Sequence, residues 1–227
     1  ATVVPRTQET PYQGILVRSL ANPPVELTEN LVEFLRYRFP DSVLAPRVWW
    51  YAPYMELGMP IYTTRDTSTR FYAMLGLSAN EEKVTASEVL LEGRWISDDF
   101  EPAILVNSRQ ADELGVQVGD YVLFNSMKLN VIGIYDIRAF DAIFDLDGNL
   151  ISPVDVRRSR QGEPPVYMPF DELVIVPAGL LLRLGGRIMA VSIILPEIGQ
   201  TVPNSEDLAQ RLMIGVHASY QGGVSIY

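Results

Sequence analysis

The sequence predicts an α+β fold in which both ends of the chain form one ferredoxin-like lobe and the middle forms an inserted, small mixed α/β lobe. A strand–helix–strand pattern at each end of the chain, flanking a middle of different composition, carries this prediction. We expect residues 1–78 and 187–227 to form the discontinuous β-α-β lobe and residues 79–186 to form the inserted lobe. The first and last β-α-β units should therefore lie in one sheet.

The first unit is a strand, a helix and a second strand. Ile15–Leu20 is an apolar run, and Thr28 stands where the N-cap of the following helix is expected. Val43–Tyr51 is the second strand. Because neighbouring side chains on a strand point to opposite faces, one of Trp49 and Trp50 should be buried.

The last unit repeats this plan. Ile188–Leu195 is an apolar strand, Asn204 or Ser205 caps a helix that ends at Gly215, and Gly222–Tyr227 is the final strand.

The inserted segment follows a strand at Phe71–Leu77. Asn80–Lys83 is expected to be a solvated turn, and Ser87–Leu91 a short helix that ends at Gly93.

The most consistent local pattern lies farther along the inserted segment. Ile104–Val106 reads as a strand, and Ser108 as the N-cap of a short helix that ends at Gly115. Tyr121–Phe124 and Leu129–Tyr135 then form the two strands of a hairpin.

Three segments of the chain carry a resemblance to a known family. The run ILVNSRQADELGVQVGDYVLFNSMKLNVIGI resembles a segment of the extracytoplasmic domain of FtsX/MacB-type ABC-transporter permeases. Upstream, LLEGRWISDDF (Leu90–Phe100) is similar to that family's Gly-Arg-aromatic segment, and downstream VYMPFDEL (Val166–Leu173) is similar to its Val-Tyr-Val-Pro strand leading into a helix. The order and spacing fit over roughly Ala73 to Gly186, and the ends match as β-α-β patterns.

The resemblance implies a MacB-like periplasmic core domain, with a porter-like lobe carrying an inserted Sabre-like lobe. It implies a non-enzymatic domain of a membrane protein, outside the cytoplasm, in the periplasm or at the cell exterior. The implied partners are a cytoplasmic ATPase subunit, reached through membrane spans beyond this chain, and a second permease in a dimer. An extracytoplasmic adaptor or substrate protein is a further candidate partner. Mechanotransmission, export and lipoprotein or partner handling are the functions that it implies.

Composition excludes several classes of function. The formal net charge of −10 and the pI near 4.6 argue against a nucleic-acid partner, which requires a positive surface. The absence of cysteine excludes thiol catalysis and cysteine-ligated metals. The longest apolar stretch, Leu173–Leu182, contains Pro177 and is shorter than the roughly 20 residues of a membrane span, so we expect the spans outside this segment.

No catalytic, cofactor-binding or metal-binding residue is predicted. The single histidine, His217, has no partner that the sequence places beside it, and a packed or strand-edge position is expected. Adjacent carboxylates cannot converge on one substrate, so three pairs are interpreted as surface charges: Glu81-Glu82, Asp98-Asp99 and Asp171-Glu172.

Two loops need an interpretation of their own. Asp145–Asn149 superficially resembles a calcium loop but lacks the later ligands, and an Asp-Gly hairpin turn between Phe144 and Leu150 explains it. The loop that contains Arg157, Arg158 and Arg160 is expected to be mobile and solvated rather than a binding patch.

Two alternative functions remain open. One is a cytosolic enzyme subunit whose middle forms a double-psi-like barrel, since Leu-Gly-Val followed by Gly-Asp also occurs there. The other is a solute- or peptide-binding module with an apolar groove. For the permease interpretation, we expect the lobes to move about a hinge near Leu77–Asn80 and Gly185–Arg187.

Overall fold

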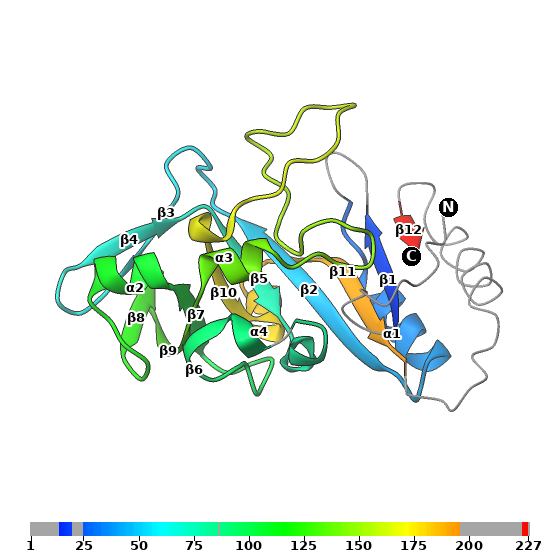
Figure 1. Cartoon of the computed structure of the whole chain (residues 1–227), viewed down its shortest axis with the longest axis horizontal. Coiled ribbons are helices and arrows are strands. Elements are labelled where there is room, and N and C mark those ends of the chain that lie inside the picture. The colour runs from blue at the N-terminus through cyan, green and yellow to red at the C-terminus, as the bar shows by residue number, and fades with distance from the viewer. Residues whose placement is uncertain (1–13, 20–24, 86, 196–223, 227) are drawn as a thin grey trace.

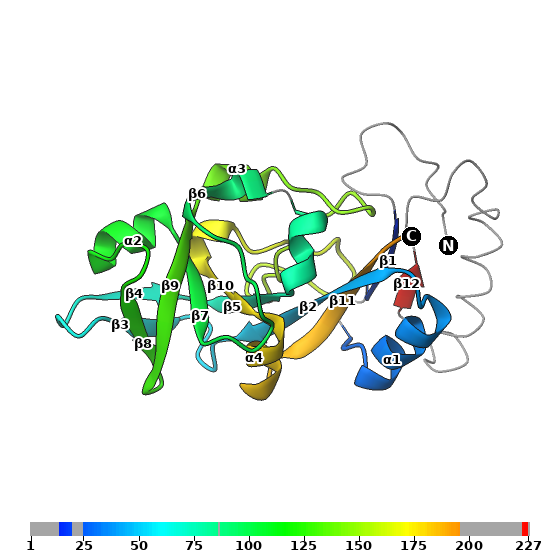
Figure 2. The same ribbon diagram turned by 90° about the horizontal axis from the view of Figure 1, so that it is seen from below.

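The fold is built on one large, open, mixed β-sheet with short helices packed around it (Figures 1 and 2). The computed structural model describes residues 14–19, 25–85, 87–195 and 224–226. Twelve strands of these residues form the sheet, in the order β12-β1-β11-β2-β5-β10-β7-β9-β8-β3-β4, with β6 pairing to β9 beside this path. Within it, β5–β10 and β7–β9 are parallel pairs.

The strands are β1 Gly14–Ser19, β2 Val43–Tyr51, β3 Met59–Tyr62, β4 Ser68–Phe71, β5 Ala73–Leu77, β6 Leu90–Gly93, β7 Ala103–Asn107, β8 Tyr121–Phe124, β9 Met127–Tyr135, β10 Leu173–Pro177, β11 Arg187–Ile194 and β12 Val224–Ile226. The α-helices are α1 Glu29–Arg38, α2 Ser108–Leu114, α3 Ile137–Asp141 and α4 Ala178–Arg183. Short 3-10 helices are η1 Ala79–Lys83, η2 Ser87–Val89 and η3 Phe170–Glu172.

The two ends of the chain share the sheet, which confirms that prediction. β1 pairs antiparallel with β11, with Ile15 opposite Ile193, and β12 pairs antiparallel with the other edge of β1. β11 in turn pairs with β2. The helix predicted after Asn204 or Ser205 lies outside the described residues.

The first unit forms as its sequence predicts. The Thr28 hydroxyl accepts a hydrogen bond from the backbone N–H of Leu31 and so caps α1. The strand β2 spans the predicted residues, and its two tryptophans lie on opposite faces of the sheet. Trp49 is 3% exposed in one apolar cluster, while the partly buried Trp50 packs against the other cluster, edge-on to Phe124.

The predicted strand–helix–hairpin pattern of the inserted segment is confirmed, with one correction at the helix start. Asn107, not Ser108, is the N-cap of α2, and Asn107 and Gln110 form a reciprocal capping box. Gly115 ends the helix in the left-handed conformation, with φ of 65°. In the hairpin turn, Asn125 and Ser126 both have positive φ, as a type I′ turn requires.

Three local predictions need correction, and one hairpin was missed. The solvated turn predicted at Asn80–Lys83 is the 3-10 helix η1, in which Glu81 is buried. The run Phe71–Leu77 is not one strand: the chain changes partners at Tyr72, so that β4 pairs with β3 and β5 pairs with β2 and β10. The helix predicted at Ser87–Leu91 is the short η2 followed by β6, because pairing to β9 extends the chain there. The hairpin of β3 and β4, which pairs with β8, was not predicted.

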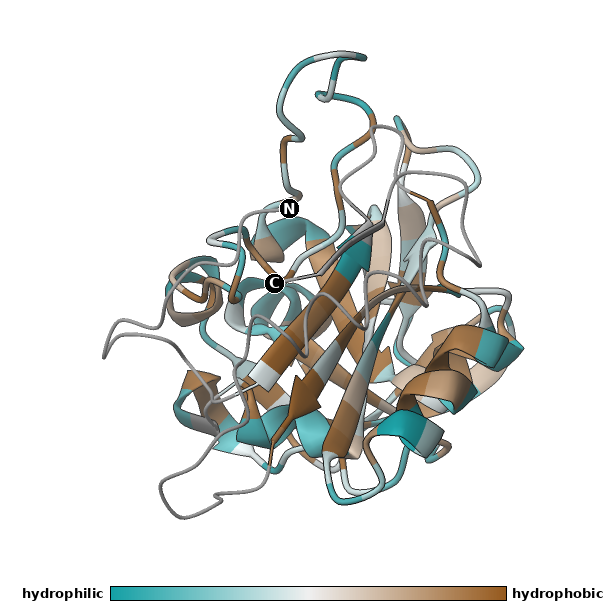
Figure 3. Cartoon of the chain, turned by 90° about the vertical axis from the view of Figure 1, so that its right-hand side faces the viewer, coloured by the Kyte–Doolittle hydropathy of each residue, from teal (hydrophilic) through white to brown (hydrophobic). Residues whose placement is uncertain are grey.

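Apolar side chains cover both faces of the sheet, so the sheet lies between two cores. Figure 3 shows hydrophobic residues along the strands and hydrophilic residues in many of the connecting loops. Tyr135, Phe140 and Phe170 stack and meet edge-on in one core, with ring centroids 4.5 to 6.2 Å apart. On the opposite face, Phe71 and Phe124 pack with ring centroids 5.6 Å apart.

Candidate functional site

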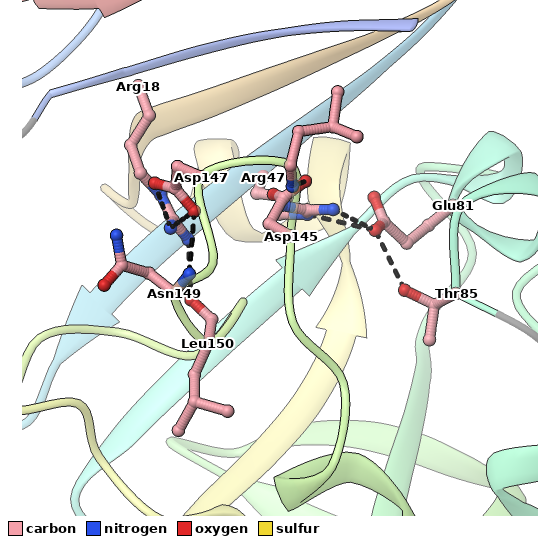
Figure 4. A network of polar contacts seen from close by, with 9 residues as sticks. Arg18, Arg47, Glu81, Thr85, Asp145, Asp147, Asn149 and Leu150 are labelled. Atoms are coloured by element: carbon pink, nitrogen blue, oxygen red, sulfur yellow. Dashed lines mark hydrogen bonds and ion pairs between the residues drawn. The ribbon is translucent and has the colours of Figure 1, made fainter. Parts of the chain in front are cut away.

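The most unusual feature of the described residues is a group of buried charges between the sheet and two loops (Figure 4). We call it the ionic cluster, and it consists of Arg18, Arg47, Glu81, Asp145 and Asp147. Both arginines come from strands β1 and β2, which belong to residues 1–78, the part of the chain before the inserted segment that we call the first segment. The three carboxylates come from the inserted segment, on η1 and on the 144–150 turn.

Arg47 is the centre of the ionic cluster. Its side chain, on β2, is fully buried, and its Nε and Nη2 donate to Oε1 of Glu81 at 3.0 and 2.8 Å. Its Nη1 donates to Asp145. The Thr85 hydroxyl donates to the same Oε1 of Glu81, at 3.1 Å. One guanidinium therefore holds two buried carboxylates from different loops.

Arg18 makes a second attachment from β1. Its Nη1 donates to both carboxylate oxygens of Asp147, at 3.0 and 3.2 Å, and its Nη2 donates to the carbonyl of Leu150 at 2.7 Å. The side chains of this ion pair are each 1% exposed. Arg18 therefore fixes the 144–150 turn against β1.

The turn itself has the predicted form. Phe144 and Leu150 are bridged antiparallel, and Gly148 has φ of 74°. Its acidic residues face arginines, and the part of the chain that the structure describes contains no group of three or more metal-ligating side chains. The resemblance to a calcium loop thus has a different physical explanation, since Asp145 and Asp147 are the anionic partners of two buried cations.

The pKa values of two carboxylates in the ionic cluster shift in opposite directions. Burial raises the pKa of Glu81 above its usual range, and Arg47 only partly offsets this effect. Burial also acts to raise the pKa of Asp145, but the charges of Arg47 and Arg18 outweigh it and leave that pKa lowered. Of these two carboxylates, Glu81 therefore holds a proton more readily than Asp145.

The interpretation of the carboxylate pairs as surface charges is wrong for Glu81, because the side chain of Glu81 is buried and paired with Arg47. The neighbouring Glu82 is exposed, as predicted. Asp99 is partly buried, and its side chain accepts a hydrogen bond from the backbone N–H of Ala79 at 2.7 Å, which fixes the start of η1. Glu172 is also partly buried, at 17% side-chain exposure.

The arginine loop is exposed at Arg160 and at residues 161–164, as predicted for a solvated loop, but two of its arginines are held in ion pairs. Arg157 pairs with Asp155 and with Glu172, and it lies over the ring of Tyr72 at 4.3 Å. Arg158 pairs with the same two carboxylates. These ion pairs hold the loop against the start of β10. His217 lies outside the described residues.

A sequence signal for the ionic cluster does exist. Arg18 and Arg47 are charged residues inside strands that are otherwise mainly apolar, and a buried arginine needs carboxylate partners. Which carboxylates they meet depends on chain segments up to 129 residues away. Only the folded chain brings these residues together.

Comparison with known proteins identifies the class to which this fold belongs. Residues 2–190 match the family described as the MacB-like periplasmic core domain. The chain belongs to this family, and it is the extracytoplasmic domain of an ABC-type transporter permease. Among the described residues, no helix has both the length and the apolar character needed to cross a membrane.

Solved structures share the fold at low sequence identity. The periplasmic region of MacB from Actinobacillus actinomycetemcomitans is 12% identical, with a TM-score of 0.59 over 94% of this chain and 88% of that chain. The extracellular domain of the noncanonic ABC-type transporter YknZ from Gram-positive bacteria is also 12% identical, with a TM-score of 0.53 over 94% of this chain and 98% of that chain. No curated protein sequence matches the chain.

Proposed function

We propose that this domain converts ATP hydrolysis by a cytoplasmic ATPase subunit into movement outside the membrane. In this proposal the ATPase acts through the membrane spans of the permease, and a second permease completes a dimer. The moving domain then drives mechanotransmission, export or the handling of a lipoprotein or other partner, with an extracytoplasmic adaptor or substrate protein receiving the movement. Membership of the permease family supports this proposal.

The continuity of the sheet supports transmission of movement through the domain. β1 and β12, the described strands nearest the two ends of the chain, lie at one end of the sheet, and β3 and β4 lie at the other (Figure 1). Backbone hydrogen bonds connect each strand to the next. A force applied near the ends of the chain is therefore carried across the sheet rather than lost in a linker.

We further propose that the domain has the two lobes predicted from its sequence, a porter-like lobe of residues 1–78 and 187–227 and a Sabre-like lobe of residues 79–186. The antiparallel order β12-β1-β11-β2 supports a ferredoxin-like porter lobe. Strand pairs β5–β10 and β3–β8 join the two segments. Movement at the proposed hinge, near 77–80 and 185–187, must therefore bend the sheet.

The observation that carries the proposal is the ionic cluster, because it joins the two segments through side chains, in addition to these strand pairs. Arg18 and Arg47 belong to the first segment, and Glu81, Asp145 and Asp147 belong to the inserted segment. Buried ion pairs with several hydrogen bonds each favour one defined arrangement of the groups that they join. The ionic cluster thus sets the relative position of the segments.

A reversible cross-link tests whether relative movement is required. Ala45 of β2 and Val84 after η1 pack together in a small apolar cluster, and the chain has no native cysteine. We expect a disulfide between cysteines at these positions to abolish partner-stimulated ATPase activity of the full permease and ATPase complex, with reductant restoring it. The two single-cysteine variants and His217→Ala serve as controls with activity near that of the unmodified protein. Full activity of the oxidised double variant would contradict the proposal.

The barrel interpretation is not supported, because the described strands form an open sheet and the chain belongs to a permease family. A cleft of about 580 Å³ favours solute or peptide binding as a second candidate function. It is lined by Trp49, Trp50, Tyr51 and Met189, with Glu26 and Arg187 among its polar groups. Tryptophan fluorescence would report a ligand there, and unchanged fluorescence on titration with a library of apolar peptides would count against this candidate.

A further inference from the structure

Glu81 has an unusual position within the ionic cluster. Its side chain is fully buried, and three hydrogen bonds converge on its Oε1, two from Arg47 and one from Thr85. Its Oε2 is also buried, and it has no hydrogen-bond partner among the described residues. Oε1 of this carboxyl group therefore accepts three hydrogen bonds, while the buried Oε2 has no hydrogen bond from the described part of the chain to replace those that it would make with water.

Within the five residues of the ionic cluster, the charges do not balance when every group is ionised. The charged groups that face Glu81 are Arg47 from β2 and Asp145 from the 144–150 turn, and Arg47 is shared between these two carboxylates. Arg18 and Asp147 complete the ionic cluster as a matched pair. Two arginines thus face three carboxylates, and a proton on Glu81 makes the sum zero.

An excess negative charge is unfavourable at such a site because water does not reach it. The raised pKa of Glu81, caused by burial, agrees with this charge balance. When Glu81 is ionised, its carboxylate and that of Asp145 repel each other, and both compete for the charge of Arg47. Arg47 by itself favours the ionised form of Glu81, but the cost of burying the charge exceeds this gain. Ionisation therefore favours states in which η1 opens from β2 and the carboxylate of Glu81 reaches solvent.

Glu81 also lies at the junction between the two segments, where a weaker contact would allow them to move relative to each other. The helix η1 begins at Ala79, directly after β5 and at the junction between the two segments. Its other attachments include the hydrogen bond from Asn80 to the carbonyl of Leu44 and the bond between Ala79 and Asp99. Release of Glu81 from Arg47 would leave η1 held by these peripheral bonds.

We propose that Glu81 is a proton-operated clasp between the two segments, closed when its carboxyl group is protonated and loosened when it is ionised. This inference rests on the proposed function, because relative movement of the segments is what the clasp would regulate. Protons of the extracytoplasmic medium are the ligand. A rise in external pH would free the inserted segment, and acidification would lock it.

Amide hydrogen exchange on the 227-residue chain tests the clasp directly. Rates are measured at several values between pH 5 and pH 9 and corrected for the intrinsic effect of pH on exchange. We expect protection of residues 79–85 and 145–150 to fall at least about tenfold as pH rises through the pKa of Glu81. Protection of β7 and β9 should stay constant and serves as the internal reference.

Three variants decide the outcome. Glu81→Gln keeps the shape and the acceptor oxygen but cannot ionise, so its protection should be independent of pH. Asp145→Asn removes the competing carboxylate, so the transition should move to lower pH. Glu82→Gln, a neighbouring exposed position, should behave as the unmodified chain. Protection that does not change with pH in the unmodified chain would overturn the proposal, as would the same pH response in Glu81→Gln.

The failure of the clasp and the failure of the proposed function are distinguishable. Exchange in the 227-residue chain reports the clasp without any transport activity, whereas the cross-link between positions 45 and 84 reports the need for movement in the full complex. A positive exchange result with an active cross-linked complex would retain the clasp and reject the coupling role. The opposite pair of results would reject the clasp alone.

Discussion

At the residue scale, Arg47 is the side chain whose loss should cost the most stability. Arg47→Met preserves much of the apolar stem but leaves Glu81 and Asp145 buried without their shared cation. We expect the free energy of unfolding at pH 7 to fall by about 3 kcal/mol or more, as for other broken buried ion pairs. Urea denaturation measures this change.

Arg36→Met is the matched control on the exposed face of α1, where the Arg36 side chain is 60% exposed. Its effect should stay within about 0.5 kcal/mol, since exposed ion pairs contribute little. Equal effects of the two substitutions would show that the ionic cluster has no special role in stability.

Asp155 should give the folded chain an acid-sensitive contribution to stability. Burial acts to raise the pKa of Asp155, but hydrogen bonds from Arg157 outweigh it, so the native-state pKa is lowered. The contribution is therefore present above the unfolded-state pKa of about 3.9 and is lost as pH falls through the lower native-state value. Asp155→Asn should destabilise the chain most at neutral pH and least near pH 2 to 3. A difference in unfolding free energy that does not vary with pH would contradict this assignment.

At the element scale, the N-cap of α2 is Asn107, whereas the sequence pattern predicted Ser108. Asn107 is buried; its side chain accepts from the N–H of Gln110 at 2.8 Å and donates to the carbonyls of Phe170 and Asp171 in η3. We expect Asn107→Ala to lower the unfolding free energy by about 1 to 2 kcal/mol. Ser108→Ala should cost less than about 0.5 kcal/mol. A larger loss for Ser108→Ala in thermal or urea denaturation would restore Ser108 as the cap.

At the scale of the whole molecule, the shared sheet should make both segments unfold together. Trp49 of the first segment and Trp95 of the inserted segment belong to the same apolar cluster. Variants that retain tryptophan only at positions 49 and 50, or only at position 95, place the fluorescent reporter in one segment at a time. For each variant, we expect the urea transition followed by tryptophan fluorescence to coincide, within error, with the transition followed by far-UV circular dichroism. Two separate midpoints within one variant would show independently stable lobes.

Local patterns in the sequence predicted much of the secondary structure and the pairing of the chain ends. Thr28 capping α1, Gly115 ending α2 and Asn125-Ser126 turning the hairpin each depend on the conformational preferences of one or two residues. The ordered segments around the hairpin also carried enough family character to predict the class of protein. These features are local, so neighbouring residues in the sequence are sufficient to encode them.

Only the tertiary structure decided which distant groups meet. No local preference pairs Arg47 with Glu81 and Asp145, and the same adjacent carboxylates, Glu81 and Glu82, have opposite environments because η1 packs against β2 on one side only. The short β3 strand likewise depends on β4 and β8 as partners, since its own four residues contain Pro60 and have a weak pattern. Burial and long-range pairing set the energy of a charge or a strand in this protein, and they exist only once the chain has folded.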